Sequence, residues 1–309
     1  MKTSIIDNPL SLQHQTPPGH PEHIGRYEAV KKALQTLEGV EWHNAEAGSR
    51  DQIERFHPAE YFDWVHSAHE LAQTGMVSLD PDTHLSQRSM ETALMSVGGA
   101  CGAVDAVMAG EIEAAFLLAR PPGHHAEPMR AMGFCVFNTI ACAALHALDH
   151  HDLDRVAIID IDVHHGNGSQ CLAEKDDRVF FASLHQSPLY PGTGSADETG
   201  LNGNVLNVPL TEGAKGATWR EAFEREVIPA LEKFKPEMVF VSAGFDAHTD
   251  DPVGGLCLED DDFAWAGTQL ADIATQFASS RLVSVLEGGY DCAALGRSAA
   301  AFVKALARA

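Results

Sequence analysis

The sequence lacks the features that mark membrane-bound and nucleic-acid-binding proteins. No stretch of its 309 residues approaches the roughly 18 consecutive apolar residues of a membrane span. The N-terminal segment MKTSIIDNPLSLQ holds no apolar run long enough for a signal peptide. Basic residues are scarce: 21 Lys and Arg stand against 44 Asp and Glu, a net charge of −23. Because a nucleic-acid backbone needs a basic face, we expect a cytoplasmic chain without a nucleic-acid or membrane partner.

Cysteines and domain linkers are also few. The six cysteines form no CxxC pair and stand at positions 101, 135, 142, 171, 257 and 292. In a chain of this size they are typical of reduced core thiols, and none has a convincing zinc-ligand spacing. Repeats, low-complexity segments and linkers rich in Gly, Ser or Pro are absent as well. We therefore expect a single domain over residues 1–309.

What the sequence does contain is a regular alternation of strand and helix patterns. Apolar, β-branched runs predict strands at 114–119, 156–160, 179–184, 205–210, 238–245 and 282–289. Apolar residues at three- and four-residue spacing predict helices near 22–37, 58–72, 88–109, 137–150, 216–234, 261–279 and 292–308. This alternation predicts an α/β fold whose mostly parallel sheet is covered by helices on both faces.

Residues suited to chemistry follow five of the predicted strands. The segments are PPGHHA (121–126), IDVHHGNG (161–168), HQSPLYPGTG (185–194), AHTDDPVGG (247–255) and GGYD (288–291). In an open parallel sheet, binding sites form beyond the carboxyl ends of the strands. We therefore expect these five segments to converge on one site.

A metal site is predicted where Asp162 and His164 follow an apolar strand. Side chains alternate with period two in extended backbone, so both side chains point the same way and can share a cation. Asp246, at the end of another apolar strand, is the candidate for the third ligand. Two Asp and one His, with a position left open, form a zinc-type catalytic set. Two unrelated solvated turns are the alternative interpretation.

Three further residues are candidates for catalysis. His124 and His125 follow a Pro-Pro-Gly turn and suit general acid–base work beside a metal, although such a turn is often only a surface loop. Asp160 and Asn167 are placed to orient the two rings. Tyr290 follows two glycines at a strand end, where a tyrosine is either simply half-buried or a donor that stabilises an oxyanion.

Together these motifs resemble the histone deacetylase family, specifically its class II branch and the bacterial histone-deacetylase-like amidohydrolases. The resemblance runs from HPEHIGR (20–26) to LEGGYD (286–291). The matching stretches are RPPGHHA (120–126), GFCVFN (133–138), DIDVHHGNG (160–168), YPGTG (190–194), SAGFDAH (242–248) and LEGGY (286–290). It implies the arginase/deacetylase α/β fold, with a parallel sheet of about eight strands.

The resemblance also implies a role for each candidate residue. One zinc ion per chain would be bound by Asp162, His164 and Asp246. The tandem histidines would be His124, paired with Asp160, and His125, paired with Asn167, the residue that class II carries where class I has Asp. Tyr290 would polarise the substrate carbonyl. The substrate-binding residues would be Gly133 through its carbonyl, Phe134 and Tyr190 as tunnel walls, Val253 at the mouth and, on a loose alignment, Asp82 at the rim. A structural potassium ion would lie near Asp160, Asp162, His164, Ser183 and Leu184.

The reaction expected from this resemblance is hydrolysis of an acyl amide, with an acyl-lysine peptide, protein or small acylated amine as substrate. We assign His125 as the base, with His124 as the alternative, because a neutral Asn partner leaves a histidine easier to deprotonate than a carboxylate would. The sequence leaves open the acyl group and the oligomeric state, a homo-oligomer included. Only SIIDNP (4–9) precedes the His-rich loop, so we expect the family's first strand to be short or rebuilt.

Three alternatives have different signatures. Polyamine-specific relatives carry a Glu seven residues after the last zinc Asp, where this chain has Val253, although the net acidity would still suit a cationic polyamine. An arginase-type enzyme with two manganese ions would need more carboxylate ligands than the two motifs offer. A non-catalytic acyl-lysine binder would not need Tyr290 together with both histidines.

Overall fold

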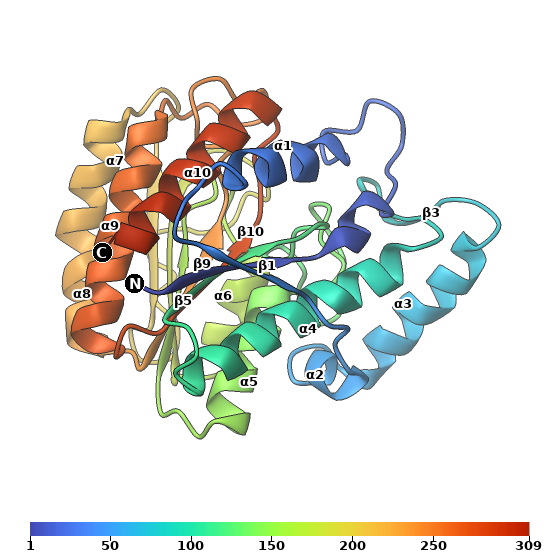
Figure 1. Cartoon of the computed structure of the whole chain (residues 1–309), viewed down its shortest axis with the longest axis horizontal. Helices are drawn as coiled ribbons and strands as arrows, with labels where there is room; N and C mark the ends of the chain where they lie inside the picture. Colours follow the sequence, from blue (N-terminus) through green and yellow to red (C-terminus); the bar gives the residue numbers. More distant parts are fainter. Residues whose placement is uncertain (309) are drawn as a thin grey trace.

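An eight-stranded sheet, parallel throughout, forms the centre of the molecule (Figure 1). The computed structural model describes residues 1–308. The strand order is β2-β1-β5-β10-β9-β6-β7-β8. The strands are β1 Thr3–Asp7, β2 Glu41–Asn44, β5 Ala114–Leu118, β6 Val156–Asp160, β7 Val179–Gln186, β8 Val205–Leu210, β9 Met238–Ala243 and β10 Leu282–Leu286. The prediction of a mostly parallel sheet of about eight strands is therefore confirmed.

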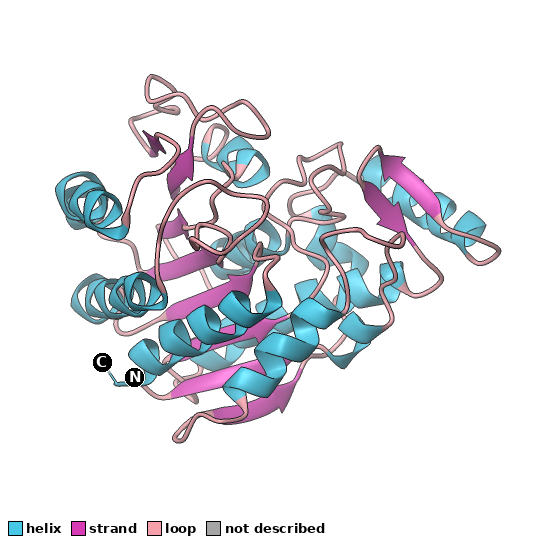
Figure 2. Cartoon of the chain, turned by 90° about the horizontal axis from the view of Figure 1, so that it is seen from above, coloured by secondary structure: helices cyan, strands magenta, loops and turns pink. Residues whose placement is uncertain are grey.

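Helices cover both faces of this sheet (Figure 2). One layer holds α1 Gly25–Leu34, α7 Gly216–Ala222, α8 Ile228–Phe234, α9 Asp260–Phe277 and α10 Cys292–Arg308. The other holds α2 Arg50–Glu54, α3 Ala59–Ala72, α4 Ser89–Met108, α5 Thr139–His150 and α6 Asn167–Ala173. In β5, Ala115 and Leu117 enter one core while Phe116 and Leu118 enter the other. Because both faces are buried, this strand is apolar along its whole length.

The sequence analysis missed β2, β3 (Val77–Asp80) and β4 (Thr83–Leu85), and it expected β1 only as a short or rebuilt first strand. β1 and β2 lie at one edge of the sheet, and β3 pairs with β4 as a separate antiparallel hairpin. β2 reads Glu-Trp-His-Asn and is largely exposed, so it has no apolar alternation to detect. β1 is short, as expected, yet it pairs in register with β5 along all five of its residues. β2 is the edge strand, and it needs no apolar pattern because most of its side chains face solvent.

The predicted helix over 216–234 is not continuous. A π-helical segment, Phe223–Val227, separates α7 from α8. Pro229 stands in the first turn of α8, where it has no N–H to donate to the preceding turn. The short helices α2 and α6 and the 3₁₀ turn Pro9–Leu12 were not predicted either. No helix within residues 1–308 is both long enough and apolar enough to cross a membrane.

The strand order brings the five functional segments together. β5, β10, β9, β6 and β7 are consecutive neighbours, although their order along the chain is different. Because all five are parallel, their carboxyl ends lie at one edge of the sheet. Two predicted strands are shorter than expected, since β9 ends at Ala243 and β10 at Leu286. The residues beyond these ends leave the sheet and form the loops of the site.

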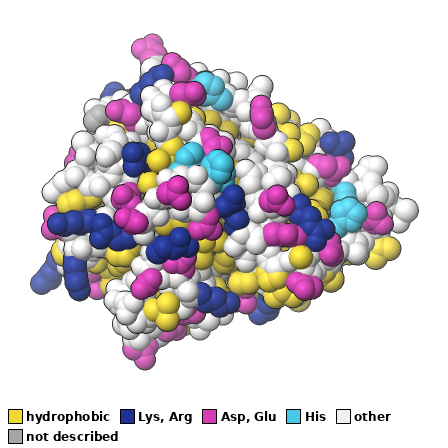
Figure 3. Space-filling view, turned by 90° about the horizontal axis from the view of Figure 1, so that it is seen from below, with side chains coloured by type: hydrophobic (Ala, Val, Ile, Leu, Met, Phe, Trp, Pro, Cys, Tyr) yellow, Lys and Arg dark blue, Asp and Glu magenta, His cyan; other side chains and the backbone are white. Residues whose placement is uncertain are grey.

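Figure 3 shows one face of the molecule, on which Lys and Arg side chains are interspersed with Asp and Glu side chains.

Candidate active site

The three predicted metal ligands converge at the carboxyl ends of β6 and β9. Asp162, His164 and Asp246 each offer one ligand atom, and these atoms lie within 4.8 Å of one another. The Nδ1 atom of His164 lies 2.9 Å from Oδ1 of Asp162 and 3.1 Å from Oδ2 of Asp246. Both carboxylates are fully buried. This arrangement can hold a cation with two carboxylates and one imidazole.

The chemistry of this donor set fits a zinc ion. Burial and the neighbouring Asp162 raise the pKa of Asp246, because two carboxylates in one dry site repel each other. A bound divalent cation relieves that repulsion. Gly244 and Gly288 approach these carboxylates so closely that a Cβ atom on either glycine would collide with them. The backbone therefore leaves room for the carboxylates and encloses them.

The two tandem histidines have different partners, as predicted. His124 Nδ1 lies 2.9 Å from Oδ2 of Asp160, and His125 Nδ1 lies 2.8 Å from Oδ1 of Asn167. Burial alone would lower the pKa of His124, but Asp160 and Asp162 outweigh it and raise that pKa well above its ordinary value. Burial, together with His124 and His164, holds the pKa of His125 well below its ordinary value. The two environments therefore shift the pKa values of the two imidazoles in opposite directions.

Glu287 holds the turn that carries these histidines, and the sequence analysis did not single it out. Its Oε2 atom accepts backbone hydrogen bonds from Gly123 at 2.6 Å and from His124 at 3.2 Å. Glu287 is fully buried, and burial raises its pKa to about 7. The signal in the sequence was an acidic residue closing the apolar strand in LEGGY, which is costly without such partners.

A cavity of about 220 Å³ opens beside the metal ligands. It is lined by Asp82, His125, Gly133, Phe134, His164, Tyr190, Val253 and Tyr290. All five residues predicted to bind substrate therefore share one cavity with the predicted metal ligand His164, the tandem histidine His125 and Tyr290. Even Asp82, placed by a loose alignment, reaches it from the turn between β3 and β4. A cavity of this size suits a narrow chain rather than a broad ligand.

Two aromatic side chains form walls of the cavity. Phe134 adopts a left-handed backbone conformation with φ 69°, directly after Gly133 with φ 56°. A left-handed phenylalanine is strained, and a hydrogen bond of 3.0 Å from its N–H to Oγ1 of Thr83 secures it. On the other side, the ring of Tyr190 packs edge-on against His125 at 5.1 Å and remains 40% exposed.

Tyr290 is positioned by two residues that the sequence analysis missed. Asp251 accepts a 2.6 Å hydrogen bond from the Tyr290 N–H. The guanidinium of Arg26 lies 4.9 Å from the centre of the Tyr290 ring, and its Nε donates to the Gly289 carbonyl at 2.5 Å. The Phe134 ring meets that of Tyr290 edge-on at 5.9 Å. Asp251 and Arg26 contact the backbone of residues 289–290 and the ring of Tyr290. A sequence motif of reactive side chains therefore does not reveal them.

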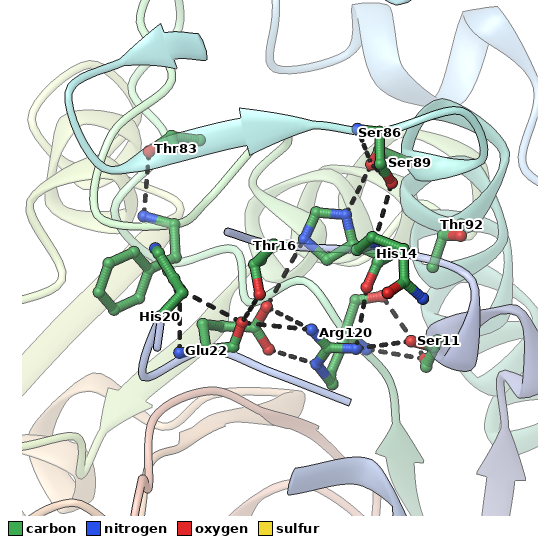
Figure 4. Close-up of polar contacts among 12 residues, drawn as sticks. Ser11, His14, Thr16, His20, Glu22, Thr83, Ser86, Ser89, Thr92 and Arg120 are labelled. Atoms are coloured by element: carbon green, nitrogen blue, oxygen red, sulfur yellow. Dashed lines mark hydrogen bonds and ion pairs between the residues drawn. The ribbon is translucent and has the colours of Figure 1, made fainter. Parts of the chain in front are cut away.

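A buried ionic network behind the cavity anchors Arg26. Glu22 bonds to Arg26 at 2.9 Å. It also bonds to Nη2 of Arg120 at 2.7 Å, and His14 Nε2 lies 3.5 Å from it (Figure 4). Burial alone would raise the pKa of Glu22, but Arg120, His14 and Arg26 hold it well below its ordinary value. The same loop supports the aromatic wall, since the His20 ring packs edge-on against Phe134 at 4.7 Å.

The residues predicted for potassium lie beside the metal ligands. Ser183 of β7 is in register with Asp160 of β6, and both side chains are fully buried. Leu184, also fully buried, follows Ser183 in the same strand. The Ser183 hydroxyl lies 2.9 Å from Nδ1 of His185. The structure therefore gathers this set on β6, on the loop that follows β6 and on β7.

Comparison with known proteins supports the same interpretation. The family model described as the histone deacetylase domain matches residues 20–306. A histone deacetylase-like amidohydrolase from Pseudomonas aeruginosa is 39% identical over 274 residues, which cover 87% of this chain and 71% of that protein. An uncharacterized protein from Synechocystis is 40% identical, over 98% of this chain and 99% of its own. The crystal structure of the HDA15 HD domain superposes with a TM-score of 0.90 at 32% identity, covering 98% of this chain and 90% of that one.

Proposed function

The chain belongs to the histone deacetylase family, and from that premise we propose that it is a zinc-dependent amidohydrolase that removes acetyl or other acyl groups from acyl-lysine side chains. One observation carries the proposal. A narrow cavity, walled by Phe134 and Tyr190, ends at His125, His164 and Tyr290. Such a cavity admits an extended acyl-amine arm and brings its carbonyl to the reactive groups.

Asp162, His164 and Asp246 would hold the zinc ion, because they bring two buried carboxylates and an imidazole within ligand distance of one another beside the cavity. Zinc held there would supply Lewis acidity, which polarises a carbonyl and acidifies water. Loss of the proton on His164 Nδ1 would accompany binding, because a histidine ligand must be neutral. These three ligands are thus suited to one zinc ion per chain.

His125 acts as the general base. Its Nδ1 faces the carbonyl oxygen of Asn167, an acceptor only, so Nδ1 carries the proton and Nε2 keeps a free lone pair. That nitrogen takes a proton from the attacking water and later returns it to the departing lysine amine. His124, paired with Asp160, stabilises the negative charge that develops on the oxygen atoms of the reacting group. The products are a carboxylate and a free amine.

Tyr290 stabilises the oxyanion that forms when water attacks. Its hydroxyl donates to the acyl oxygen, and Asp251 and Arg26 hold the turn so that this donor needs no reorganisation. Phe134 and Tyr190 exclude water from the methylene chain of the substrate. The Gly133 carbonyl accepts a hydrogen bond from the substrate amide, and Asp82 contacts the substrate backbone at the rim.

A peptide or protein lysine is the substrate class that the cavity mouth favours. Val253 lines the mouth and offers no charge for the secondary ammonium of a polyamine. Acetylpolyamine deacetylation remains the second candidate, because it uses the same chemistry and the chain is strongly acidic. An arginase-type dimetal site is disfavoured, since the cluster at this cavity comprises only three ligands within residues 1–308. Potassium beside Asp160, Asp162, His164, Ser183 and Leu184 would have a structural role.

A substrate panel tests this proposal. We expect kcat/KM to be higher for acetyl-lysine peptides and longer acyl-lysine peptides than for acetylpolyamines. A strong preference for acetylpolyamines would replace lysine by polyamine as the substrate class. Binding of acyl-lysine peptides without hydrolysis by the zinc-loaded protein would instead indicate a binding module.

A further inference from the structure

A second cluster of histidines lies where the end of α5 meets α4. Asp105 belongs to α4, His146 and His150 to α5, and His151 follows directly. Each residue offers one ligand atom, and all four atoms lie within 4.8 Å of one another. His146 and His150 are four residues apart, the spacing that puts two imidazoles on one face of a helix. Three imidazoles and one carboxylate therefore meet at one point.

The contacts within this cluster are centred on one carboxylate oxygen. Oδ1 of Asp105 lies 2.7 Å from Nε2 of His146 and 2.7 Å from Nε2 of His151. The His150 ring stacks on His146 at 4.8 Å and meets His151 edge-on at 4.9 Å. The four ligand atoms thus lie close together, as the ligands of one tetrahedral ion must.

The surroundings suit a cation. The cluster lies at the C-terminus of α5, where the helix dipole and the last carbonyls favour positive charge. Half of the Asp105 side chain is exposed, so an ion can enter, whereas His146 is almost fully buried. Nδ1 of His146 finds no hydrogen-bond partner among residues 1–308. A buried imidazole with only one satisfied nitrogen is costly, and an ion bound at Nε2 beside Asp105 would strengthen the one polar interaction that this ring makes.

From this geometry we propose that Asp105, His146, His150 and His151 form a second metal site, which binds a divalent transition ion of the zinc class. Imidazole with one carboxylate suits Zn²⁺ and its neighbours rather than Mg²⁺ or Ca²⁺. The nearby cations do not fill the site: Arg178 pairs with Asp149 and Asp176, and Arg55 affects His146 through its charge only.

This site is separate from the candidate active site. Asn138, which caps the start of α5, donates to the carbonyl of His124. The twelve residues of α5 then run for about 17 Å to the opposite edge of the sheet. Figure 3 shows the face below the lower end of α5 in Figure 1, with a group of His side chains near its middle beside acidic side chains. The ion would bind α4 to α5 and stabilise their packing without touching substrate.

The proposal is tested by measuring how much zinc the full-length protein binds at equilibrium. The wild type is dialysed against buffered Zn²⁺, and bound zinc per chain is measured by elemental analysis. We expect about two ions in the wild type and about one in the double variant His150→Ala/His151→Ala, with deacetylase activity unchanged. The matched control is His66→Ala, an exposed histidine on α3, which should bind as much zinc as the wild type. Asp246→Ala should lose the other ion and keep this one.

The inference depends on the difference between the wild type and the double variant, so it does not depend on the active-site ion. Equal zinc content in the two proteins would overturn it, as would an equal loss in His66→Ala. A thermal scan adds a second readout, because a ligand that binds only the folded state raises Tm. We expect added Zn²⁺ to raise Tm more in the wild type than in the double variant. An identical rise in both would also contradict the site.

Discussion

Asp251 accepts a hydrogen bond of 2.6 Å from the backbone N–H of Tyr290, and the same carboxylate also bonds to the backbone of Val253 at the cavity mouth. Its Oδ2 also accepts from the Asp291 N–H at 3.3 Å, and its Oδ1 accepts from the Val253 N–H at 3.0 Å. One nearly buried side chain thus fixes the turn that carries the proposed oxyanion donor and the residue at the mouth. Asp251 is therefore a positioning residue for the proposed reaction.

Asp251→Ala should lower kcat on the order of 10- to 100-fold, because the Tyr290 hydroxyl is then no longer held at the developing oxyanion. Losing hydrogen bonds to a charged group should also cost about 1.5–3 kcal/mol of stability. The matched control is Asp250→Ala, which removes an exposed carboxylate next in the chain. Normal kcat in Asp251→Ala with the fold intact would contradict the positioning role.

Tyr290→Phe removes one hydroxyl and leaves the ring between Phe134 and Arg26. Losing an oxyanion donor typically lowers kcat by roughly 10²–10³, and KM should change far less because the hydroxyl acts mainly in the transition state. Tyr190→Phe, at the opposite wall, should retain most of the turnover. The test is to measure kcat, KM and zinc content on the same samples of each variant. A near-normal kcat in Tyr290→Phe would show that Tyr290 is not a catalytic residue.

Asp246→Ala should lose both the active-site metal and activity, because a site of three protein ligands cannot spare one. Asp162→Ala should behave in the same way, and a strong chelator should inactivate the wild type. Elemental analysis and an activity assay provide the measurement. Full activity in Asp246→Ala would refute the metal assignment.

Val253→Glu should shift the ratio of kcat/KM values toward acetylpolyamines by about 1–2 kcal/mol, because a partly desolvated carboxylate pairs with a secondary ammonium. Val253→Gln is the matched control, since glutamine has nearly the shape of glutamate but no charge. If both variants change the ratio equally, charge at the mouth does not determine the choice of substrate.

Glu22→Gln should cost about 3–5 kcal/mol of unfolding free energy at neutral pH, because Arg26 and Arg120 are left buried without their partner. The pKa of Glu22 lies well below 4.5 in the folded state, so its ionised form stabilises the protein above about pH 4.5. That stabilisation is lost as the pH falls through the folded pKa. Urea unfolding across pH should therefore show the difference between wild type and Glu22→Gln narrowing below about pH 4.5, and a constant difference would contradict the linkage.

The sequence by itself determined the fold class and the identity of the reactive groups. Alternating strand and helix patterns predict a parallel sheet, and the period-two spacing of Asp162 and His164 is a local property of the chain. A carboxylate or imidazole at the end of an apolar strand is conspicuous because it is costly to bury without a partner. Such signals need no knowledge of distant contacts.

Only the tertiary structure decided which of these groups meet, and what holds them. β9 and β10 are inserted between β5 and β6, which brings Asp246 to His164 and Tyr290 to His125 around one cavity. Asp251, Glu287 and Arg26 act through backbone atoms of residues far along the chain, a role that any acceptor or donor in the right place can fill. Their roles escape a reading of the sequence because a hydrogen bond depends on distance and direction in space, and residue type alone specifies neither.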